Sequence, residues 1–272
     1  MNKNISIIIS TYNSPEWLAK VIWGYNTQTY RNFEMIIADD GSKQPTFDLI
    51  ETLQKEVFFS IKHVWHPDNG FQKSAILNKA IVACETDYIL MSDGDCIPRP
   101  DFVEQHILHR EEGYFLSGGY HKLNMHLSKF ITKEHIYSGV CFERNWLLKN
   151  GMKLSIKNLK VYASGLYSAL LNFLTPTSPT WNGHNASGWK TDIVAINGFD
   201  ERMQYGGQDR ELGERLVNLG IKSKQIRYST TCLHLDHKRG YATQESIQKN
   251  KDIRKNTRTT GVKWTDFGIK PA

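Results

Sequence analysis

Short apolar runs and amphipathic segments alternate along the first third of the chain. The apolar runs are rich in β-branched and aromatic residues, which predicts strands at 5–9, 33–38, 58–64 and 88–91. Helical spacing of apolar residues predicts helices between them at 15–28, 45–55 and 72–83. Pro15 supports the first helix, because proline fits a first helical turn and Ser14 could cap it. This order predicts an α/β fold with a mostly parallel sheet flanked by helices.

The second half of the chain has a less regular pattern. We expect short strands mixed with loops over about 112–160 and a long loop at 175–188, which contains two prolines and two glycines. Long loops beside a ligand site often act as lids. A strand is predicted at 225–229, and a helix at 208–219, where the helical pattern ends at Gly220.

Polar residues follow each of the four predicted strands. The clusters are Thr11-Tyr12-Asn13, Asp39-Asp40-Gly41-Ser42, Asn69-Gly70 and Asp93-Gly94-Asp95. Because ligands bind beyond the carboxyl ends of parallel strands, these clusters should meet at one edge of the sheet. Neither G-x-G-x-x-G nor G-x-x-x-x-G-K-[ST] follows the first strand, which disfavours an NAD-type fold and a P-loop. The pattern therefore predicts one ligand site of another kind.

The carboxylates of Asp93 and Asp95 follow the apolar run Tyr88-Ile89-Leu90. With only a glycine between them, they form an oxygen-rich corner of the kind that Mg²⁺ or Mn²⁺ prefers. A metal ion there could hold a diphosphate. The alternative is a plain strand-ending turn, since Asp and Gly are common in turns for backbone reasons alone.

The composition indicates a soluble globular protein. The chain has 272 residues, of which 40% are hydrophobic and 23% are charged. No apolar run reaches the roughly 18 residues that span a bilayer, and the first apolar run is too short for a signal peptide. The four cysteines form no C-x-x-C pair, which disfavours a structural zinc site and favours a reducing compartment. We therefore expect a cytoplasmic protein.

The net charge of +6 is concentrated near the end of the chain. Residues 238–263 contain eight Lys or Arg and two acidic residues, so this segment alone carries the excess. We expect 241–272 to form a basic tail, which could contact an anionic membrane from its cytoplasmic side, a phosphorylated substrate or nucleic acid. A solvated face near a frayed end is the alternative. Basic and aromatic residues do not interleave elsewhere, which disfavours nucleic acid as a partner.

Five segments in order resemble the GT-A glycosyltransferases of family two, the inverting enzymes that use nucleotide sugars. They are ISIIISTYN, ADDGS, GFQKSAILNKAI, SDGDCIPRPDF and WKTDIVAINGFDERMQYGGQDRELGERL. The last is similar to the acceptor side of β-1,4-galactosyltransferases, chondroitin-type polymerases and polypeptide N-acetylgalactosaminyltransferases. The resemblance implies one Rossmann-like GT-A domain over 1–240, with a nucleotide-sugar-binding half at 1–110 and an acceptor and catalytic-base half at 111–240.

The resemblance also implies which residues bind the nucleotide sugar. Tyr12 would stack on the base, Asp40 would accept a hydrogen bond from the base, and Asp93 would face the ribose. Lys73 and Asn78 would approach ribose or phosphate. The full donor set is Thr11, Tyr12, Asn13, Asp39, Asp40, Lys73, Asn78 and Asp93. The alternatives are simple packing for Tyr12 and a plain turn at Asp40.

Asp95 would coordinate the Mn²⁺ or Mg²⁺ ion that bridges the two phosphates. Related enzymes supply a histidine from the region of Cys232-Leu233-His234-Leu235-Asp236-His237, and imidazole together with carboxylate suits Mn²⁺. His237 fits the resemblance better than His234. Histidines outside such a motif are more often structural.

Asp209 matches the catalytic base of the family, at the start of a helix on the acceptor side. A helix N-terminus favours the ionised carboxylate that a base requires, although an Asp there can also serve only to stabilise the helix. Gln208 precedes it where Glu is usual, so acceptor contacts should differ from those of relatives. Aromatic and amide side chains near this motif suit a sugar or acceptor pocket, and the expected set is Trp181, Asn185, Trp189 and Gln208.

These features predict a metal-dependent inverting glycosyltransferase. It would move a hexose or N-acetylhexosamine from a UDP-sugar to a hydroxyl of a glycan or lipid-linked acceptor, in bacterial surface polysaccharide or lipopolysaccharide synthesis. A sugar nucleotidyltransferase is one alternative, but it should show a glycine-rich phosphate loop, which the segment STYNSPEW lacks. A non-catalytic carbohydrate- or nucleic-acid-binding module is the other.

Overall fold

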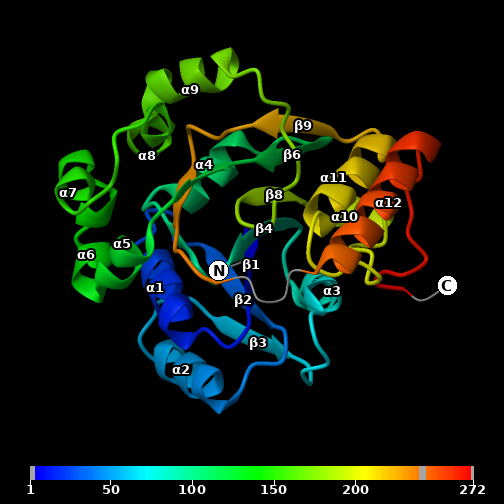
Figure 1. Cartoon of the computed structure of the whole chain (residues 1–272), viewed down its shortest axis with the longest axis horizontal. Helices are drawn as coiled ribbons and strands as arrows, with labels where there is room; N and C mark the ends of the chain where they lie inside the picture. Colours follow the sequence, from blue (N-terminus) through cyan, green and yellow to red (C-terminus); the bar gives the residue numbers. More distant parts are fainter. Residues whose placement is uncertain (1–3, 239–242, 271–272) are drawn as a thin grey trace.

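The computed structural model describes residues 4–238 and 243–270 (Figure 1). In this part of the chain, the central sheet has seven strands in the order β3-β2-β1-β4-β8-β6-β9. Four of them are the strands predicted from the first third of the sequence: β1 (Ile5–Thr11), β2 (Phe33–Asp39), β3 (Ile61–Trp65) and β4 (Tyr88–Asp93). These four pair in parallel. The predicted α/β fold with a mostly parallel sheet is confirmed.

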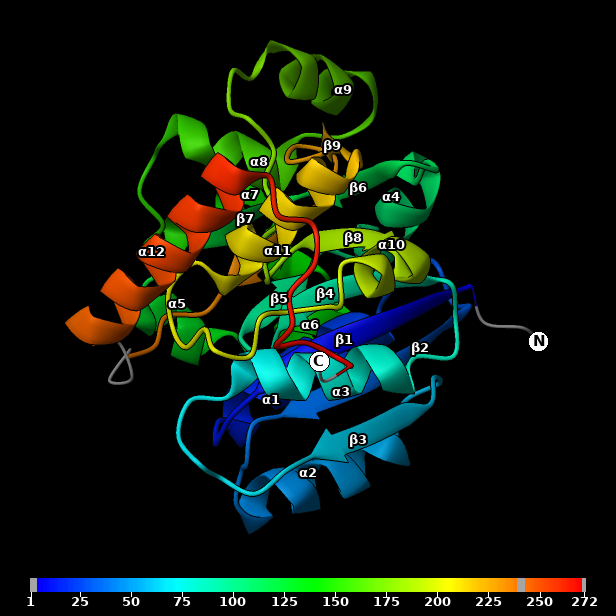
Figure 2. The same ribbon diagram turned by 90° about the vertical axis from the view of Figure 1, so that its right-hand side faces the viewer.

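Helices α1 (Pro15–Asn26), α2 (Gln44–Gln54) and α3 (Lys73–Ala83) connect these strands, close to their predicted bounds. Alternation along β1 divides the core between the two faces of the sheet. Ile7 and Ile9 pack in one cluster with residues of α1 and α2. Ile8 packs in another with residues of α3, α10 (Lys190–Ala195) and α11 (Gln208–Leu219). Helices therefore cover both faces of the sheet, and loops follow the carboxyl ends of its parallel strands (Figure 2).

Strands of the second half complete the sheet with reversed directions. β8 (Ala186–Trp189) runs antiparallel to β4 and to β6 (Tyr114–Ser117), and β6 pairs in parallel with β9 (Lys222–Gln225). A second, three-stranded sheet contains β5 (Cys96–Pro98), β10 (Thr231–His234) and β7 (Gly119–Lys122). The strand predicted at 225–229 is wrong. Gln225 is the last residue of β9, and residues 226–229 belong to the turn between β9 and β10, where Ser229 N and Thr230 N both donate to Ile226 O.

The region 112–160 is more helical than predicted. After β7 come α5 (Met125–Phe130), α6 (Lys133–Tyr137), a 3-10 turn (Val140–Phe142), α7 (Arg144–Lys149), a second 3-10 turn (Ile156–Asn158) and α8 (Leu159–Tyr162). Each is too short to show helical periodicity in the sequence. Their apolar side chains form a third core cluster together with Leu233 and Leu235 of the segment around β10. Two other helices, α4 (Phe102–His109) and α9 (Gly165–Leu174), flank this region. The loop predicted at 175–188 is three residues shorter than predicted, because 186–188 belong to β8.

Helices α10 (Lys190–Ala195), α11 (Gln208–Leu219) and α12 (Gln244–Thr260) complete the fold. The segment predicted as a basic tail contains α12, which lies alongside α11 (Figures 1 and 2). Arg254 pairs with Glu214, and Thr257 Oγ1 donates to Glu211 Oε1 over 3.0 Å. These contacts make the segment part of the folded domain and not a frayed tail.

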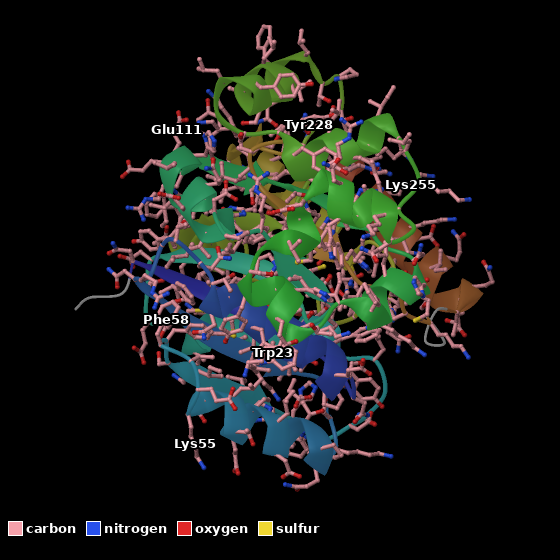
Figure 3. All side chains as sticks on the ribbon, turned by 90° about the vertical axis from the view of Figure 1, so that its left-hand side faces the viewer. Trp23, Lys55, Phe58, Glu111, Tyr228 and Lys255 are labelled. Atoms are coloured by element: carbon pink, nitrogen blue, oxygen red, sulfur yellow. The ribbon has the colours of Figure 1, made fainter. Side chains whose placement is uncertain are left out.

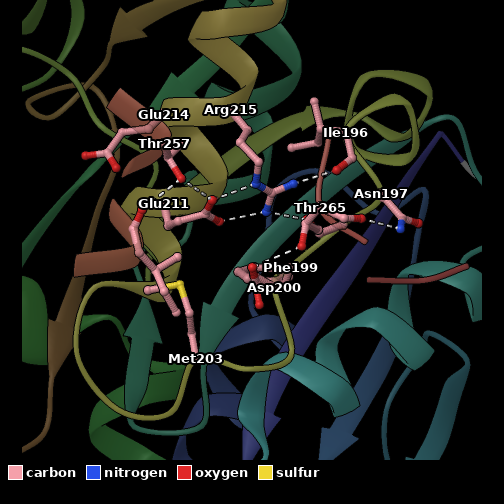
Figure 4. Close-up of polar contacts among 12 residues, drawn as sticks. Ile196, Asn197, Phe199, Asp200, Met203, Glu211, Glu214, Arg215, Thr257 and Thr265 are labelled. Carbon is pink, nitrogen blue, oxygen red and sulfur yellow. Dashed lines mark hydrogen bonds and ion pairs between the residues drawn. The ribbon is translucent and has the colours of Figure 1, made fainter. Parts of the chain in front are cut away.

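The contacts of α12 extend to a buried ion pair within α11 (Figure 4). Arg215 donates to both carboxylate oxygens of Glu211 over 2.7 Å and to the backbone carbonyls of Ile196 and Gly198. Beyond α12, Thr265 Oγ1 donates to Asp200 Oδ2 over 3.0 Å. Residues 243–270 thus anchor both α11 and the loop that precedes it.

No helix in the described ranges is both long and apolar enough to cross a bilayer.

Candidate active site

A cavity of about 560 Å³ opens at the carboxyl ends of β1, β2 and β4. Its wall contains residues from every predicted polar cluster, from α11 and from the segment that begins at the end of β10: Thr11, Tyr12, Asp40, Gly70, Asp93, Asp95, Gln208, Asp209, His234 and His237. The clusters lie together because parallel strands present their carboxyl ends at one edge of the sheet.

Asp93, at the end of β4, is held by two donors. Lys73 Nζ donates to Asp93 Oδ1 over 2.6 Å, and Ser10 Oγ donates to the same oxygen over 2.7 Å. Burial opposes ionisation of Asp93, but the ammonium of Lys73 outweighs it and holds the carboxyl pKa well below its usual range. Burial likewise opposes the charge on Lys73, yet Asp93, Asp209 and Asp95 together raise its pKa above the ordinary value. Lys73 therefore places a fixed positive charge among three carboxylates.

Asp95, His234 and His237 form a cluster in which one possible ligand atom of each residue lies within 4.8 Å of the others. Asp95 Oδ2 is 3.0 Å from His237 Nε2 and 3.9 Å from His234 Nε2. The other ring nitrogen faces a backbone carbonyl, with Nδ1 of His234 2.8 Å from Leu235 O and Nδ1 of His237 2.9 Å from Lys238 O. Because a carbonyl only accepts, Nδ1 of each ring carries a proton, and Nε2 is the ring nitrogen that faces Asp95.

This arrangement fits a divalent cation. A carboxylate oxygen and an imidazole nitrogen about 3 Å apart have a spacing typical of two ligands of one ion bound at about 2.1 Å. Oxygen and imidazole nitrogen together suit Mn²⁺. Asp93, Asp95 and Cys96 form a second group of possible ligands, but burial raises the pKa of the Cys96 thiol well above its usual value, which disfavours the thiolate.

Tyr12 and Asp40, in another part of the cavity wall, have the features of a base-binding pocket. Tyr12 lies at the rim with 47% of its surface exposed, and its hydroxyl donates to Asp68 Oδ2 over 2.8 Å. Asp40 lies behind it, where Oδ1 is 2.8 Å from His66 Nε2 and Oδ2 accepts from Gln72 N over 3.0 Å. Burial raises the pKa of Asp40 despite these partners. An exposed aromatic ring beside a buried acceptor can receive a planar base that has an N–H edge.

Three residues of the predicted donor set lie outside the cavity wall. Asp39 Oδ1 accepts from Ser42 N, and Asn13 Oδ1 accepts from Lys43 N, so both brace the loop after β2. Asn78 is buried within α3, where its side chain donates to Phe199 O and accepts from Phe199 N. The structure thus places these three side chains in the support of the cavity, whereas Thr11, Tyr12, Asp40, Lys73 and Asp93 line it.

Asp209 is the second residue of α11. The helix follows two glycines with left-handed backbone angles, Gly206 (φ 113°) and Gly207 (φ 93°). Its Oδ1 is buried and has no hydrogen-bond partner in the described residues. Burial raises the pKa of this carboxyl, and Lys73 acts in the opposite direction. The backbone of Gly183, in the loop before β8, lies next to the carboxylate of Asp209. A Cβ at this position would come within 2.8 Å of Asp209 Oδ1, so the close approach requires a glycine. The neighbouring Gln208 also lines the cavity.

The predicted acceptor residues other than Gln208 do not line the cavity. Trp181 is completely buried and packs on Phe115 in the core. Asn185 is also buried, with its amide bonded to Gly119 O and His106. Trp189 lies at the far end of β8, opposite Tyr88 at the start of β4. The antiparallel pairing of β8 with β4 explains this placement, because it directs Trp189 away from the edge that carries Asp93.

Sequence reasoning missed several residues of the cavity wall: Trp17, Phe71, Tyr120, Lys122 and Tyr205. His184, in the loop whose composition suits a sugar pocket, also lines the cavity. Tyr120 packs against His184, with ring centroids 4.4 Å apart. Burial lowers the pKa of His184 to about 4, so its ring is neutral at pH 7. Trp17 lies on α1, and Tyr120 and Lys122 lie on β7, whose position depends on long-range pairing. Phe71 and Tyr205 lie within segments that carry the family resemblance, but nothing in the sequence marked their side chains as part of a cavity wall.

The sequence model of "Glycosyl transferase family 2" matches residues 6–164. This chain belongs to that family. The match covers β1 to α8 and therefore includes the cavity residues from Thr11 to Asp95. The domain is a glycosyltransferase domain, and the fold is that of the GT-A glycosyltransferases predicted from the sequence.

Two curated relatives extend the likeness beyond the matched region. The chain is 26% identical to chondroitin synthase of Escherichia coli over 240 residues and 27% identical to hyaluronan synthase of Pasteurella multocida over 239 residues. Each alignment covers 82% of this chain, but only 33% and 24% of the two relatives. The chain therefore corresponds to a third or less of these larger proteins.

Solved structures show the same fold at low sequence identity. S. aureus TarS 1-349 in complex with UDP-GlcNAc matches 92% of this chain and 64% of its own, with a TM-score of 0.59 and 13% identity. The mannosyltransferase PcManGT from Pyrobaculum calidifontis, in complex with GDP-Man and Mn²⁺, matches 89% of this chain and 59% of its own, with a TM-score of 0.55 and 13% identity.

Proposed function

We propose that this domain is a metal-dependent inverting glycosyltransferase. It moves a hexose or N-acetylhexosamine from a UDP-sugar to a hydroxyl of a glycan or lipid-linked acceptor. One observation carries the proposal: a single cavity holds both the cluster around Asp95 and the buried, unpartnered carboxylate oxygen of Asp209. The cluster suits a diphosphate leaving group, and the carboxylate suits a general base. Direct displacement at a sugar carbon requires both.

The nucleotide is assigned to the end of the cavity that contains Tyr12 and Asp40. The exposed ring of Tyr12 offers a stacking surface, and Asp40 accepts a hydrogen bond from the N–H edge of uracil, since each carboxylate oxygen has a second lone pair. Asp93 faces the ribose. A neighbour by fold, TarS, is described in complex with UDP-GlcNAc, which supports a donor of this class.

Asp95, His237 and His234 would hold Mn²⁺ or Mg²⁺, with His237 the nearer histidine to the carboxylate. When bound, the cation neutralises charge that develops on the leaving diphosphate. Lys73 supplies a second positive charge in a fixed position, and this requires no proton transfer. The description of PcManGT in complex with Mn²⁺ supports this choice of metal.

Asp209 is assigned as the general base. Its Oδ1 takes the proton of the acceptor hydroxyl while the hydroxyl oxygen bonds to the anomeric carbon, and the bond from that carbon to the diphosphate oxygen breaks. Attack opposite the leaving group inverts the configuration. Burial raises the pKa of Asp209, which makes its ionised form a stronger base than an exposed aspartate.

The acceptor is assigned to the side of the cavity near Gln208. Tyr120 and Tyr205 replace the predicted tryptophans as the aromatic surfaces there, because they line the cavity and Trp181 and Trp189 do not. Two curated relatives are named for chondroitin and hyaluronan synthesis, which supports a glycan acceptor. We place the reaction in cytoplasmic synthesis of a bacterial surface polysaccharide or lipopolysaccharide.

Thermal unfolding with UDP, Mn²⁺ or both tests this function. The midpoint should rise most with both together, because ligands that bind only the folded state stabilise it. A panel of UDP-sugars should then show metal-dependent release of UDP from one of them, and Asp209→Asn should slow that release at least about 10²-fold. A sugar nucleotidyltransferase would instead consume UTP and a sugar phosphate, and a binding module would release no UDP. Either result would contradict the proposal.

A further inference from the structure

Helix α9 is amphipathic, but its polar side, and not its apolar side, packs against the rest of the protein. Its polar side chains face the body: Ser168 is buried, Asn172 Nδ2 donates to Ser229 Oγ over 2.8 Å, and Asn172 Oδ1 accepts from Tyr228 N. Figure 3 shows α9 at the outer end of the molecule near Tyr228, with side chains that project away from the body. The polar face of α9 therefore holds the helix in place.

The apolar face of α9 points to solvent. Leu166, Leu170, Phe173 and Leu174 lie three or four positions apart along it, so they share one side of the helix. Leu166 is 91% exposed and Phe173 is 85% exposed. In the segment before α8, Leu154 and Ile156 are also largely exposed. Soluble monomers seldom leave such contiguous apolar side chains uncovered.

This apolar surface belongs to a segment with positive charge and no acidic residue. Residues 144–174 contain Arg144, Lys149, Lys153, Lys157 and Lys160, and no Asp or Glu. Arg227 adds a further like charge near Lys160. In the described ranges, none of these lysines forms an ion pair. Their charge is thus available to a partner outside the chain.

We propose that α9 and residues 149–160 dock this protein on an anionic lipid bilayer. Exposed apolar side chains in a segment that carries basic and no acidic residues match an interface where acyl chains lie beneath negatively charged headgroups. At ten residues, α9 is about 15 Å long, too short to span a bilayer and suited to lie in its surface. A second copy of the chain is a poorer partner for this face, because it would bring the same unneutralised lysines together.

This surface differs from the basic segment in which the sequence predicted membrane contact. On α12, Arg254 and Arg258 already face Glu214, and none of the described residues within the helix is a large exposed hydrophobic residue. The α9 surface also reaches the cavity, since Lys160 Nζ lies 5.8 Å from the ring of Tyr120. If the proposed function holds, docking through α9 would bring the acceptor side of the cavity close to a lipid-linked acceptor.

Sedimentation of the full chain with vesicles tests the docking surface. The wild type should bind vesicles that contain phosphatidylglycerol and should bind pure phosphatidylcholine much more weakly. Leu166→Gln/Phe173→Gln should lower the partition coefficient at least about tenfold. The matched control is Leu108→Gln/Val217→Gln, which replaces exposed apolar residues on α4 and α11 and should bind as the wild type does.

The charge is tested in the same way. Lys153→Gln/Lys157→Gln should weaken binding about fivefold for each lysine, whereas Lys249→Gln/Lys251→Gln on α12 should have little effect. All variants replace exposed residues, and stabilisation by UDP with Mn²⁺ should remain as in the wild type, which separates this proposal from the proposed function. Unchanged binding by the Leu166/Phe173 variant would overturn the proposal. So would lipid-free dimerisation that this variant abolishes in a protein that does not bind vesicles.

Discussion

Lys73 Nζ and Asp93 Oδ1 form a 2.6 Å ion pair at the centre of the cavity. The pair joins the first turn of α3 to the end of β4. Because Asp209 and Asp95 also act on Lys73, one ammonium balances carboxylates on both the metal side and the acceptor side of the site. The protonation of these groups is therefore coupled.

Replacing Lys73 with Met tests this coupling. Lys73 lowers the pKa of both Asp93 and Asp209, so its loss should raise both. We expect the acidic limb of the pH profile of kcat/KM to move to higher pH and the KM for the donor to increase. Lys62→Met, which replaces a lysine bonded to Ala83 O outside the cavity, is the control. An acidic limb at the wild-type position would contradict the coupling.

Asp209→Asn should reduce turnover by at least about 10²-fold and leave UDP affinity unchanged. In the wild type, activity requires the ionised carboxylate and should fall as the pH decreases through the raised pKa of Asp209. That limb should be absent from the residual activity of the variant. Asp192→Asn is a matched control, because burial also raises the pKa of Asp192, which lies outside the cavity. A collapse of UDP binding in Asp209→Asn would instead indicate a structural role.

His237→Ala and His234→Ala should each weaken Mn²⁺ binding at least about tenfold, because even partners of metal ligands have effects of that size. The effect should be larger for His237, whose Nε2 lies nearer to Asp95. Asp95→Ala should abolish metal-dependent UDP binding with the fold intact. Calorimetric titration with Mn²⁺ measures these affinities, and His126→Ala, at an exposed position on α5, is the control. Wild-type Mn²⁺ affinity in all three variants would refute the assigned ligands.

His106 should make the fold sensitive to acid. Both of its ring nitrogens are bonded, to Ser187 Oγ and Asn185 Oδ1, and burial lowers its pKa to about 3. An unfolded chain has a histidine pKa of about 6.5, so below that pH the unfolded state binds one more proton. The stability is complete above about pH 6.5 and should fall by up to about 1.4 kcal/mol per pH unit as the pH decreases toward 3.

Urea unfolding between about pH 7 and pH 4 measures this loss. His106→Gln should be less stable at neutral pH, since the buried bonds change, and should show a shallower dependence on pH. The exposed His126→Ala should keep the wild-type slope. An equal slope in His106→Gln and the wild type would show that other groups cause the acid sensitivity.

The first half of the fold was predictable because its information is local. Strands β1, β2 and β4 are buried on both faces, so they appear in the sequence as continuous apolar runs, and their ends position Thr11, Asp40 and Asp93. His234 and His237 were predicted only through the family resemblance. The structure brings them to Asp95 through the pairing of β10 with β5.

The acceptor side could not be predicted because it depends on pairing between distant segments. No local sequence pattern indicates that β8 pairs antiparallel with β4. Because of this pairing, Trp189 lies at the edge of the sheet away from Asp93, and Trp181 packs in the core. The sequence spacing partly indicates the buried position of Asn78, because Ser74, Asn78 and Ile81 occupy one buried side of α3. That spacing favours a support role over contact with a ligand.

The packing of α12 against α11 has a consequence for synthesis of the protein. Helix α11, which carries Asp209 in its first turn, is held by contacts from Arg254 to Glu214 and from Thr257 to Glu211. Thr265 holds the preceding loop at Asp200. As the ribosome releases the chain from its N-terminus, the sheet and the nucleotide end can form first. The acceptor side can reach its final structure only after residues 244–270 have emerged. A nascent chain stalled before that point would have a formed donor pocket but no ordered base.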